Sequence, residues 1–335
     1  MRVLCSLFLL FFIGYADVIK SKDRLGREVE RPPVMERIAI TCYGGAIHEI
    51  VLFLGEEKIV AHPGAQRFKF FEKLYPKLTK VQSIGTFNDV NLETLLKVKP
   101  DIVFAGITAQ ATNKRIEALG IPVFTLGTGV HTLETLLNEF TQVGILVGKE
   151  EKAKRLVSYW NETIGNLKKT LPKSEKRLKI LYANGSGKIS SEIKGRWGDS
   201  FIKSAGGINV VENFPLEGDI SAEMLLKLNP DVLILSKNMS QQVTPELIKT
   251  NPMYKNLNAV KNNQVYVAPI GGFWWDRPSP EAILGIIWLN KILYPEQTKD
   301  IDLFTQTQIF FQEFYNYELK KEEYKTFFTS SKEFR

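Results

Sequence analysis

Hydrophobic residues along this chain recur either at helical spacing or in short continuous runs. Leu92, Leu95 and Leu96 are spaced so that they share one face of a helix. Pro100 then disfavours continuation of that helix, and the run Ile102–Ala105 is apolar at every position. Such a run is typical of a strand that is buried on both faces of a parallel sheet. The segment therefore predicts half of a β-α-β unit.

The same helix-strand segment occurs twice, at Asp89–Phe104 and at Asp219–Ile234. The residues that recur with an offset of 130 are Asp89, Glu93, Leu95, Leu96, Lys97, Pro100 and Asp101, which match Asp219, Glu223, Leu225, Leu226, Lys227, Pro230 and Asp231. An internal repeat of this length indicates two units of the same architecture.

Further apolar runs surround each copy of the segment. Arg37–Ile40 and Arg177–Leu181 precede the two copies, and Ile121–Leu126 and Gln264–Ala268 follow them. Strands that alternate with helices predict an α/β fold with a parallel sheet in each half.

The two halves are joined by helical patterns. Apolar spacing fits one helix over Leu133–Val143 and a longer one over Ala153–Leu171, separated by Gly148. Because no flexible Gly/Ser linker occurs here, we expect a rigid strut and a nearly fixed orientation of the lobes. The aromatic-rich segment Leu303–Phe328 predicts a helical cap whose rings belong to the core.

The amino terminus has the pattern of a cleavable export signal. Arg2 is followed by the apolar run Val3–Ile13 and a small-residue stop at Ala16. The run is too short for a membrane-spanning helix, which needs about 20 residues. Cys5 would leave with the signal, or could carry a lipid, although no small residue stands just before it. We expect a periplasmic protein with one cysteine, Cys42, and no intrachain disulfide.

These patterns together predict five regions. They are a signal peptide at 1–16, an N-terminal lobe at 17–147, an inter-lobe helix at 148–173, a C-terminal lobe at 174–293 and a C-terminal helical cap at 294–335.

The charge pattern excludes some partners. The chain has 44 Lys and Arg against 37 Asp and Glu, a formal net charge of +7. Because positively and negatively charged residues are interspersed along the chain, they indicate a solvated surface and no nucleic-acid patch. No GxGxxG motif follows the first strand of either half, and we expect no enzymatic activity, no catalytic residues and no cofactor.

The loop Pro269–Arg277 is the sharpest candidate for ligand binding, because open α/β sheets bind ligands beyond the carboxyl ends of their strands. Two glycines are followed by Phe273, Trp274 and Trp275 beside Arg277. Aromatic rings favour a flat ligand, and the arginine fork suits carboxylate or catecholate oxygens. The alternative is that one indole packs into the core while the arginine pairs with a nearby acid.

Other candidates occupy equivalent loops in both halves. The expected ligand contacts outside the aromatic loop are Tyr43, Phe87, Thr108, His131, Arg196 and Trp197.

The three histidines, His48, His62 and His131, are too scattered to predict a caged Zn²⁺ or Mn²⁺ ion. His48 fits a satisfied histidine in a helix, and His62 fits a loop before Pro63. His131 lies between a strand end and a helix start, where it could complete the coordination of a metal held by a small chelator. A structural or exposed role for His131 is the alternative.

Several short motifs stand in a specific order. They are Asp23–Val29, Asn91–Leu96 with Lys99–Asp101, Gly206–Asn209, Ser221–Leu226, Arg277–Glu281, and Leu293–Glu296 with Asp300–Asp302. In this order the chain resembles the class III periplasmic binding proteins of importers for siderophores, haem, cobalamin and related chelates. The narrower resemblance is to the CeuE-like proteins of Helicobacter and Campylobacter.

The resemblance implies two Rossmann-like lobes bridged by a long helix, with a metal chelate held between them. It also implies that Glu93 and Glu223 dock onto arginines of a homodimeric ABC permease, which works with its ATPase. The protein itself would be a monomer that meets the membrane only through the permease. The local alternative is that each glutamate only stabilises the first turn of its helix.

The ligand stays open at this level. A ferric siderophore or haem fits the aromatic loop, a nickel or cobalt complex with a small chelator fits His131, and cobalamin is a third candidate. A bare-ion receptor would need three or four converging protein ligands. A two-lobed enzyme, such as a glycosyltransferase or a chelatase, is the alternative from another class, because paired Rossmann-like lobes also house such activities.

Overall fold

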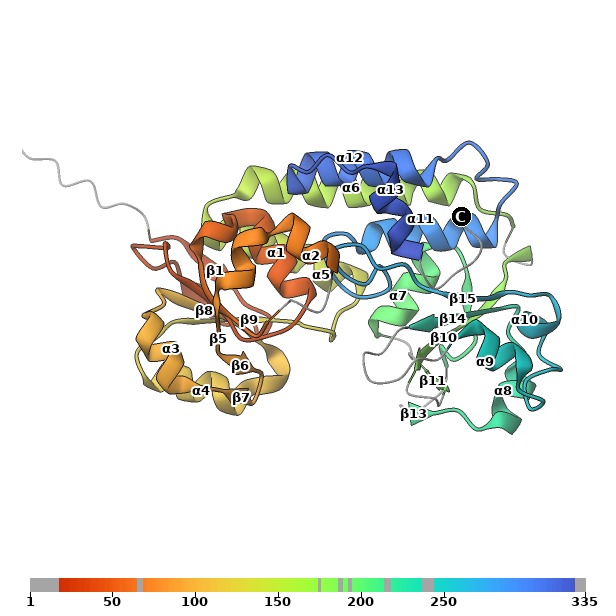
Figure 1. Ribbon diagram of the computed structural model, residues 1–335, viewed down its shortest axis with the longest axis horizontal. Helices are drawn as coiled ribbons and strands as arrows, with labels where there is room; N and C mark the ends of the chain where they lie inside the picture. Colours follow the sequence, from red (N-terminus) through yellow and green to blue (C-terminus); the bar gives the residue numbers. More distant parts are fainter. Residues whose placement is uncertain are drawn as a thin grey trace, which may run out of the picture.

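The computed structural model describes residues 18–64, 69–173, 176–185, 189–191, 195–213, 218–236 and 244–328. The expected export signal at 1–16 lies outside these residues. Two lobes lie next to each other, and a layer of long helices runs across both of them (Figure 1).

The first lobe contains a five-stranded sheet whose paired strands are all parallel. In sheet order the strands are β5 (Gln82–Ser83), β4 (Ile59–His62), β3 (Ile38–Ile40), β8 (Ile102–Gly106) and β9 (Val123–Leu126). The helices of this lobe are α1 (Gly45–Leu54), α2 (Lys69–Leu74), α3 (Leu92–Val98), α4 (Gln110–Ala118) and α5 (Leu133–Val147). Because helices cover both faces, every residue of β3, β8 and β9 is buried.

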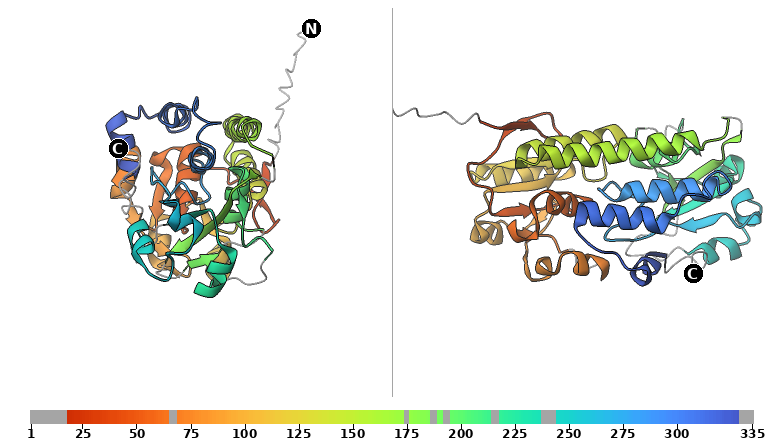
Figure 2. Two further views of the ribbon diagram at one scale, coloured as in Figure 1. Left: turned by 90° about the vertical axis from the view of Figure 1, so that its right-hand side faces the viewer. Right: turned by 90° about the horizontal axis from the view of Figure 1, so that it is seen from above.

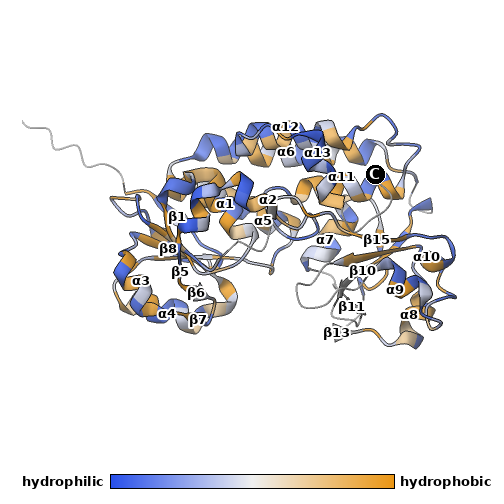
Figure 3. Ribbon diagram, viewed as in Figure 1, coloured by the Kyte–Doolittle hydropathy of each residue, from blue (hydrophilic) through white to orange (hydrophobic). Residues whose placement is uncertain are grey.

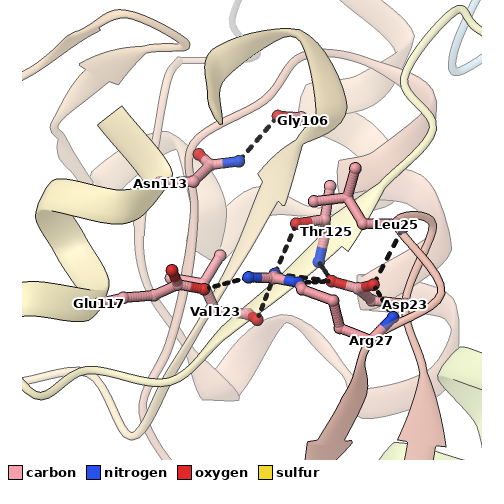
Figure 4. Close-up of polar contacts among 8 residues, drawn as sticks. All are labelled: Asp23, Leu25, Arg27, Gly106, Asn113, Glu117, Val123 and Thr125. Carbon is pink, nitrogen blue, oxygen red and sulfur yellow. Dashed lines mark hydrogen bonds and ion pairs between the residues drawn. The ribbon is translucent and has the colours of Figure 1, made fainter. Parts of the chain in front are cut away.

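Two short antiparallel pairs accompany this sheet, and one of them is fixed by a buried carboxylate. The pairs are β1 (Lys20–Lys22) with β2 (Glu28–Glu30), and β6 (Gly85–Thr86) with β7 (Asp89–Val90). Asp23 accepts hydrogen bonds from the backbone N–H groups of Leu25, Arg27 and Thr125, and the guanidinium of Arg27 pairs with Asp23 and Glu117 (Figure 4). The hairpin β1–β2 is therefore attached to β9.

The second lobe contains a six-stranded mixed sheet. In order its strands are β13 (Gly218–Asp219), β11 (Ile189–Ser191), β10 (Lys179–Gly185), β14 (Val232–Ser236) and β15 (Val265–Val267), while β12 (Ile208–Asn209) also pairs with β10. Its helices are α7 (Trp197–Ser204), α8 (Ala222–Leu228), α9 (Pro245–Thr250) and α10 (Asn258–Lys261). The expected parallel pairing holds for β10, β12, β14 and β15, whereas β11 and β13 are antiparallel additions.

The inter-lobe strut is the 20-residue helix α6 (Glu150–Lys169). Gly148 separates it from α5 and adopts the left-handed conformation that glycine tolerates, with φ 68°. The helices α11 (Ala282–Leu293) and α12 (Leu303–Tyr315) run beside α6, as the view from above in Figure 2 shows. Arg155 of α6 forms an ion pair with Glu313 of α12.

The carboxyl-terminal segment joins the two lobes a second time. After α12, the chain forms α13 (Lys321–Lys325) and a 3₁₀ turn at Thr326–Phe328. Phe311 of α12 packs on Phe70 of α2 with ring centroids 5.8 Å apart, and Tyr315 packs on Tyr75. Lys73 of α2 pairs with Glu323 of α13. Phe310, Phe311 and Phe314 of the cap are thus core residues, as expected, whereas Phe304 is half-buried and packs on Tyr324.

These elements confirm the predicted α/β fold of two lobes joined by a long helix. The central strands carry hydrophobic residues, whereas the long upper helices α6 and α12 carry both kinds (Figure 3). No helix within the described ranges combines the length and the apolar character needed to cross a membrane.

Candidate ligand-binding cleft

A cavity of about 240 Å³ lies where the two lobes meet. The first lobe contributes Tyr43, Gly45, Ala46, Glu49, Phe87, Thr128, Gly129, His131, Leu136 and Glu139, and the second contributes Phe273, Arg277 and Pro278. The first-lobe loops follow the carboxyl ends of β3 and β9, where open α/β sheets bind their ligands.

Two glycines let the lobes approach each other at this cavity. A Cβ atom on Gly44 would lie 2.3 Å from the ring of Phe273, and one on Gly45 would lie 2.1 Å from the carbonyl oxygen of Pro278. Gly44 also has φ 68°, a conformation that other residues rarely adopt. The start of α1 therefore packs directly against the loop of the second lobe.

Arg277 supplies a positive charge at the second-lobe wall. Its guanidinium stacks over the ring of Trp274, 4.0 Å from the ring centroid, and one N–H donates to Ser236 Oγ at 3.5 Å. Its charge also acts on the neighbouring carboxyl of Asp276, whose pKa burial raises and Arg277 lowers, with burial the larger effect. The arginine is held by aromatic and polar contacts while it lines the cavity.

Three polar side chains form the first-lobe floor, which we define as Glu49, His131 and Glu139. His131 Nε2 lies 2.9 Å from Glu139 Oε1, and the Gly127 N–H donates to Glu139 Oε2 at 2.6 Å. Burial raises the pKa of Glu49 well above its usual range, and the neighbouring Glu139 carboxyl raises it further. The floor thus contains a carboxyl pair in which Glu49 favours its protonated form.

Four of the expected ligand contacts line the cavity, namely Tyr43, Phe87, His131 and Arg277. The rings of Tyr43 and Phe87 meet edge to face, with centroids 5.7 Å apart. Phe87 adopts φ 48°, and its N–H donates to the Thr41 carbonyl at 2.7 Å. A strained backbone at a bulky residue is a recurrent feature of ligand sites.

Two indoles that we expected at the ligand are core residues instead. Trp275 is fully buried and packs on Phe327 and Phe328 of the carboxyl-terminal segment. Trp197 is also buried, and its N–H donates to the Asp276 carbonyl at 2.9 Å. Neither indole is among the described residues that line the cavity.

Trp274, Thr108 and Arg196 are not among the described residues that line the cavity. Trp274 contacts two residues that do line the cavity, because its ring packs against Arg277 and Phe273. Thr108 is exposed on the 3₁₀ turn Ile107–Ala109, and Arg196 is the half-buried residue before α7.

The other two histidines have structural roles. His48 is buried in α1, as expected for a helix histidine; its Nε2 contacts the Gly272 carbonyl at 3.0 Å, and burial lowers its pKa to about 3. His62 ends strand β4 and does not lie in a loop as expected; its Nε2 lies 2.9 Å from the Leu78 carbonyl. Across the described parts of the chain, no three His, Cys, Asp or Glu side chains are grouped as a metal site.

Two residues that line the cavity, Glu49 and Glu139, were not expected from the sequence. Both glutamates interrupt apolar helical faces: Glu49 lies within the hydrophobic α1, and Glu139 lies three residues after the buried Leu136. An acid on an apolar helix face is a usable signal, because charged groups are seldom buried without a partner.

Glu93 and Glu223 do not line the cavity and lie in the first turns of α3 and α8. Both are exposed, and Glu93 Oε1 pairs with Lys97 Nζ at 2.7 Å on the surface. The helices α3 and α8 lie in different lobes, on the side of the molecule away from α6 (Figure 1).

Comparison with known proteins places this geometry in context. A family model described as "Periplasmic binding protein" matches residues 40–270. The Fe(3+)-citrate-binding protein YfmC of Bacillus subtilis is 29% identical over 59% of the chain, and the match covers 62% of YfmC. The molybdate-binding protein MolA of Haemophilus influenzae is 28% identical over 93% of the chain and 95% of MolA, and its molybdate-bound structure has a TM-score of 0.76. The structure of Helicobacter pylori CeuE in complex with nickel and histidine has a TM-score of 0.74 over 93% of the chain and 99% of CeuE; its 18% identity shows the shared fold alone.

Proposed function

The chain belongs to the periplasmic binding protein family, and from this premise we propose that it captures a small metal chelate between its lobes and delivers it to an importer. It is a substrate-binding protein of an ABC transporter, with a periplasmic or other extracytoplasmic location. We further propose that a cleavable signal at 1–16 exports it and that it acts as a monomer.

The size of the cavity carries the proposal for a small ligand. Its volume is about 240 Å³. Drug-sized ligands occupy pockets of about 300–1,000 Å³. Haem, cobalamin and bulky siderophores exceed this space, and the double connection between the lobes opposes a wide opening. A chelator of the size of citrate or a single amino acid fits.

The charges in the cavity support a ligand with two different ends. Arg277 offers a cation and a donor fork to a carboxylate arm of the chelator. The floor offers carboxyl and imidazole groups to the metal end, with His131 completing the coordination of a metal that arrives already chelated. The contact between His131 Nε2 and Glu139 resembles the arrangement in which a carboxylate orients a metal-binding imidazole, and Nδ1 is a buried atom without a hydrogen-bond partner among the described residues.

A bare oxyanion is the second candidate, because the cavity is small and MolA binds molybdate. The floor weighs against it, because the carboxylate of Glu139 would repel an oxyanion placed close to it; the protonated form of Glu49 would not. An enzymatic role, as in a two-lobed glycosyltransferase or chelatase, has no support from the groups in this cavity.

Isothermal titration of the purified protein with ferric citrate, nickel(II) with histidine, molybdate, haemin and cobalamin tests the proposal. We expect saturable binding of ferric citrate or the nickel complex. Saturation by molybdate alone would establish the oxyanion alternative. Binding of haemin or cobalamin alone, or of no probe, would contradict a small-chelate function.

We also propose that Glu93 and Glu223 dock onto basic residues of a homodimeric permease that works with its ATPase. Their equivalent places in two copies of one segment suit a partner with twofold symmetry. The variant Glu93→Lys with Glu223→Lys should abolish uptake and leave chelate affinity intact. Unchanged uptake would contradict the docking role.

A further inference from the structure

Six of the seven pairs of repeated residues, all except Asp89 and Asp219, fall into two groups when both copies are placed in the structure. Leu95 and Leu225 are buried, at 0% and 1% exposure, on the inner faces of α3 and α8. Pro100 and Pro230 are also buried, directly before the central strands β8 and β14. Packing of the core accounts for the recurrence of these four residues.

The recurrence of Asp101 and Asp231 has a structural cause as well. Asp101 Oδ2 accepts the backbone N–H of Arg37 at 2.9 Å, and Asp231 Oδ2 accepts the backbone N–H of Lys179 at 2.9 Å. Each aspartate therefore holds the start of the neighbouring first strand in its lobe. The fold requires these carboxylates whatever the surface does.

A second group is repeated on the surface, and helix charges and the Glu93–Lys97 ion pair account for its glutamates and lysines but not for its leucines. Its members are exposed on the outer faces of α3 and α8: Glu93, Leu96 and Lys97 in the first lobe, and Glu223, Leu226 and Lys227 in the second. Leu96 and Leu226 are 46% and 40% exposed, which is unusual for two leucines at equivalent sites. Single exposed leucines need no explanation, but a matched pair next to a matched pair of acids does.

We propose that Leu96 and Leu226 are paired apolar contacts of the permease-docking surface. This inference rests on the proposed docking function of Glu93 and Glu223 and adds the contacts that bury apolar area. Residues at positions i and i+3 of a helix lie on the same side, so each leucine is next to its glutamate. Each lobe thus presents an acid and a leucine to one half of a twofold-symmetric partner.

The arrangement of the two helices fits a single partner that spans both lobes. The helices α3 and α8 lie at opposite ends of the molecule on the side away from α6 (Figure 1). They have matching ends: Asn91 and Ser221 cap the amino ends, and Lys99 and Asn229 close the carboxyl ends in the left-handed conformation, with φ 44° and 41°. The partner must therefore offer two equivalent patches, each with a basic group and an apolar recess.

Other exposed apolar residues provide matched controls. Leu119 of the first lobe is 42% exposed and Leu247 of the second is 58% exposed. Neither leucine recurs with the offset of 130. Lys249 stands at the position equivalent to Leu119, and Glu117 stands at the position equivalent to Leu247. They test whether loss of any exposed leucine pair weakens docking.

The experiment measures the affinity of the full chain for the permease–ATPase complex of its importer, held in lipid nanodiscs. Glutamine replaces leucine in the double variant Leu96→Gln with Leu226→Gln, because it keeps helix propensity. We expect roughly a tenfold loss per leucine and about a hundredfold for the pair, from the lost apolar burial. The control Leu119→Gln with Leu247→Gln should stay within twofold.

Three outcomes decide between the inferences. If the Leu96 and Leu226 variant binds the permease like the wild type while Glu93→Lys with Glu223→Lys does not, the leucine contacts are refuted and the acid contacts stand. If both variants bind normally, docking through α3 and α8 is refuted altogether. Ferric citrate titration of the same proteins tests ligand capture separately, and thermal unfolding together with the single variants Leu96→Gln and Leu226→Gln separates lost docking from misfolding.

Discussion

The guanidinium of Arg277 stacks on the indole of Trp274, with its central carbon 4.0 Å from the ring centroid. A cation over an aromatic face is stabilised by about 0.5–2 kcal/mol, depending on its exposure. Although Trp274 does not itself line the cavity, the stack holds the guanidinium of Arg277, which does.

We predict that Arg277→Lys weakens binding of ferric citrate roughly tenfold, because lysine keeps the charge but loses the planar fork and the stack. Titration calorimetry measures the change. The matched control is Arg196→Lys, which alters a half-buried arginine outside the cavity and should leave the affinity within twofold. Equal losses in both variants would refute the special role of Arg277.

The floor gives a second prediction. His131→Ala should weaken binding of the nickel complex with histidine at least tenfold and binding of molybdate much less, because only a metal gains from an imidazole donor. Glu139→Gln should weaken the nickel complex as well, since an amide cannot accept from both His131 and the Gly127 N–H. A parallel loss for nickel and molybdate would contradict metal coordination.

A control for that experiment is His62→Gln. His62 is buried and hydrogen-bonded to the Leu78 carbonyl, but it lies outside the cavity. Its loss should lower the free energy of unfolding by about 1–3 kcal/mol, as for a broken buried hydrogen bond, without a change in affinity.

Much of the fold could be predicted because its signals are periodic or repeated. Buried strands such as Ile102–Gly106 leave continuous apolar runs, and the recurrence of the segment at Asp89 and Asp219 indicates two lobes. The carboxyl end of α5 likewise has a local signature, because Gly148 adopts a left-handed conformation that residues other than glycine rarely adopt. Each of these features depends on local chemistry that a single sequence records.

The site was predicted less well, because side-chain direction in a loop follows no period. Phe273, Trp274 and Trp275 are adjacent, yet they line the cavity, support Arg277 and enter the core, respectively. The last of these directions depends on Phe327 and Phe328, more than fifty residues later. Only the tertiary fold brings such partners together.

That division of roles gives a third prediction. Trp275→Phe should lower the free energy of unfolding by roughly 1–3 kcal/mol, through a cavity in the core, and leave ferric citrate affinity unchanged. Trp274→Leu should do the reverse: a smaller stability loss and a several-fold weaker affinity, because Arg277 loses its support. Urea unfolding and calorimetry of both variants measure the two effects. Weakened affinity in Trp275→Phe at full stability would restore that indole as a ligand contact.

The last prediction concerns Glu281, which is buried under the same loop and accepts hydrogen bonds from the backbone N–H groups of Gly272 and Phe273. Burial raises the pKa of Glu281 from 4.5 to about 8. The nearby His48 has a pKa of about 3, and burial raises the pKa values of Tyr75 and Tyr315 well above 10. Among these neighbours, only Glu281 changes its charge between pH 4.5 and 8.

Because the folded state holds this proton more tightly than the unfolded chain, the stabilisation from Glu281 is fully present below pH 4.5 and is lost as the pH rises to about 8. The contribution falls by at most about 1.4 kcal/mol per pH unit. Glu281→Gln stays neutral throughout, so its free energy of unfolding should decline less over this range, by urea denaturation at several pH values. The slope from Glu49 is common to both proteins and cancels in the comparison. The control is Glu246→Gln, which alters an exposed carboxyl of α9 and should follow the wild type. If the free energy of unfolding of Glu281→Gln declined with pH as steeply as that of the wild type, Glu281 would be ionised in the folded protein.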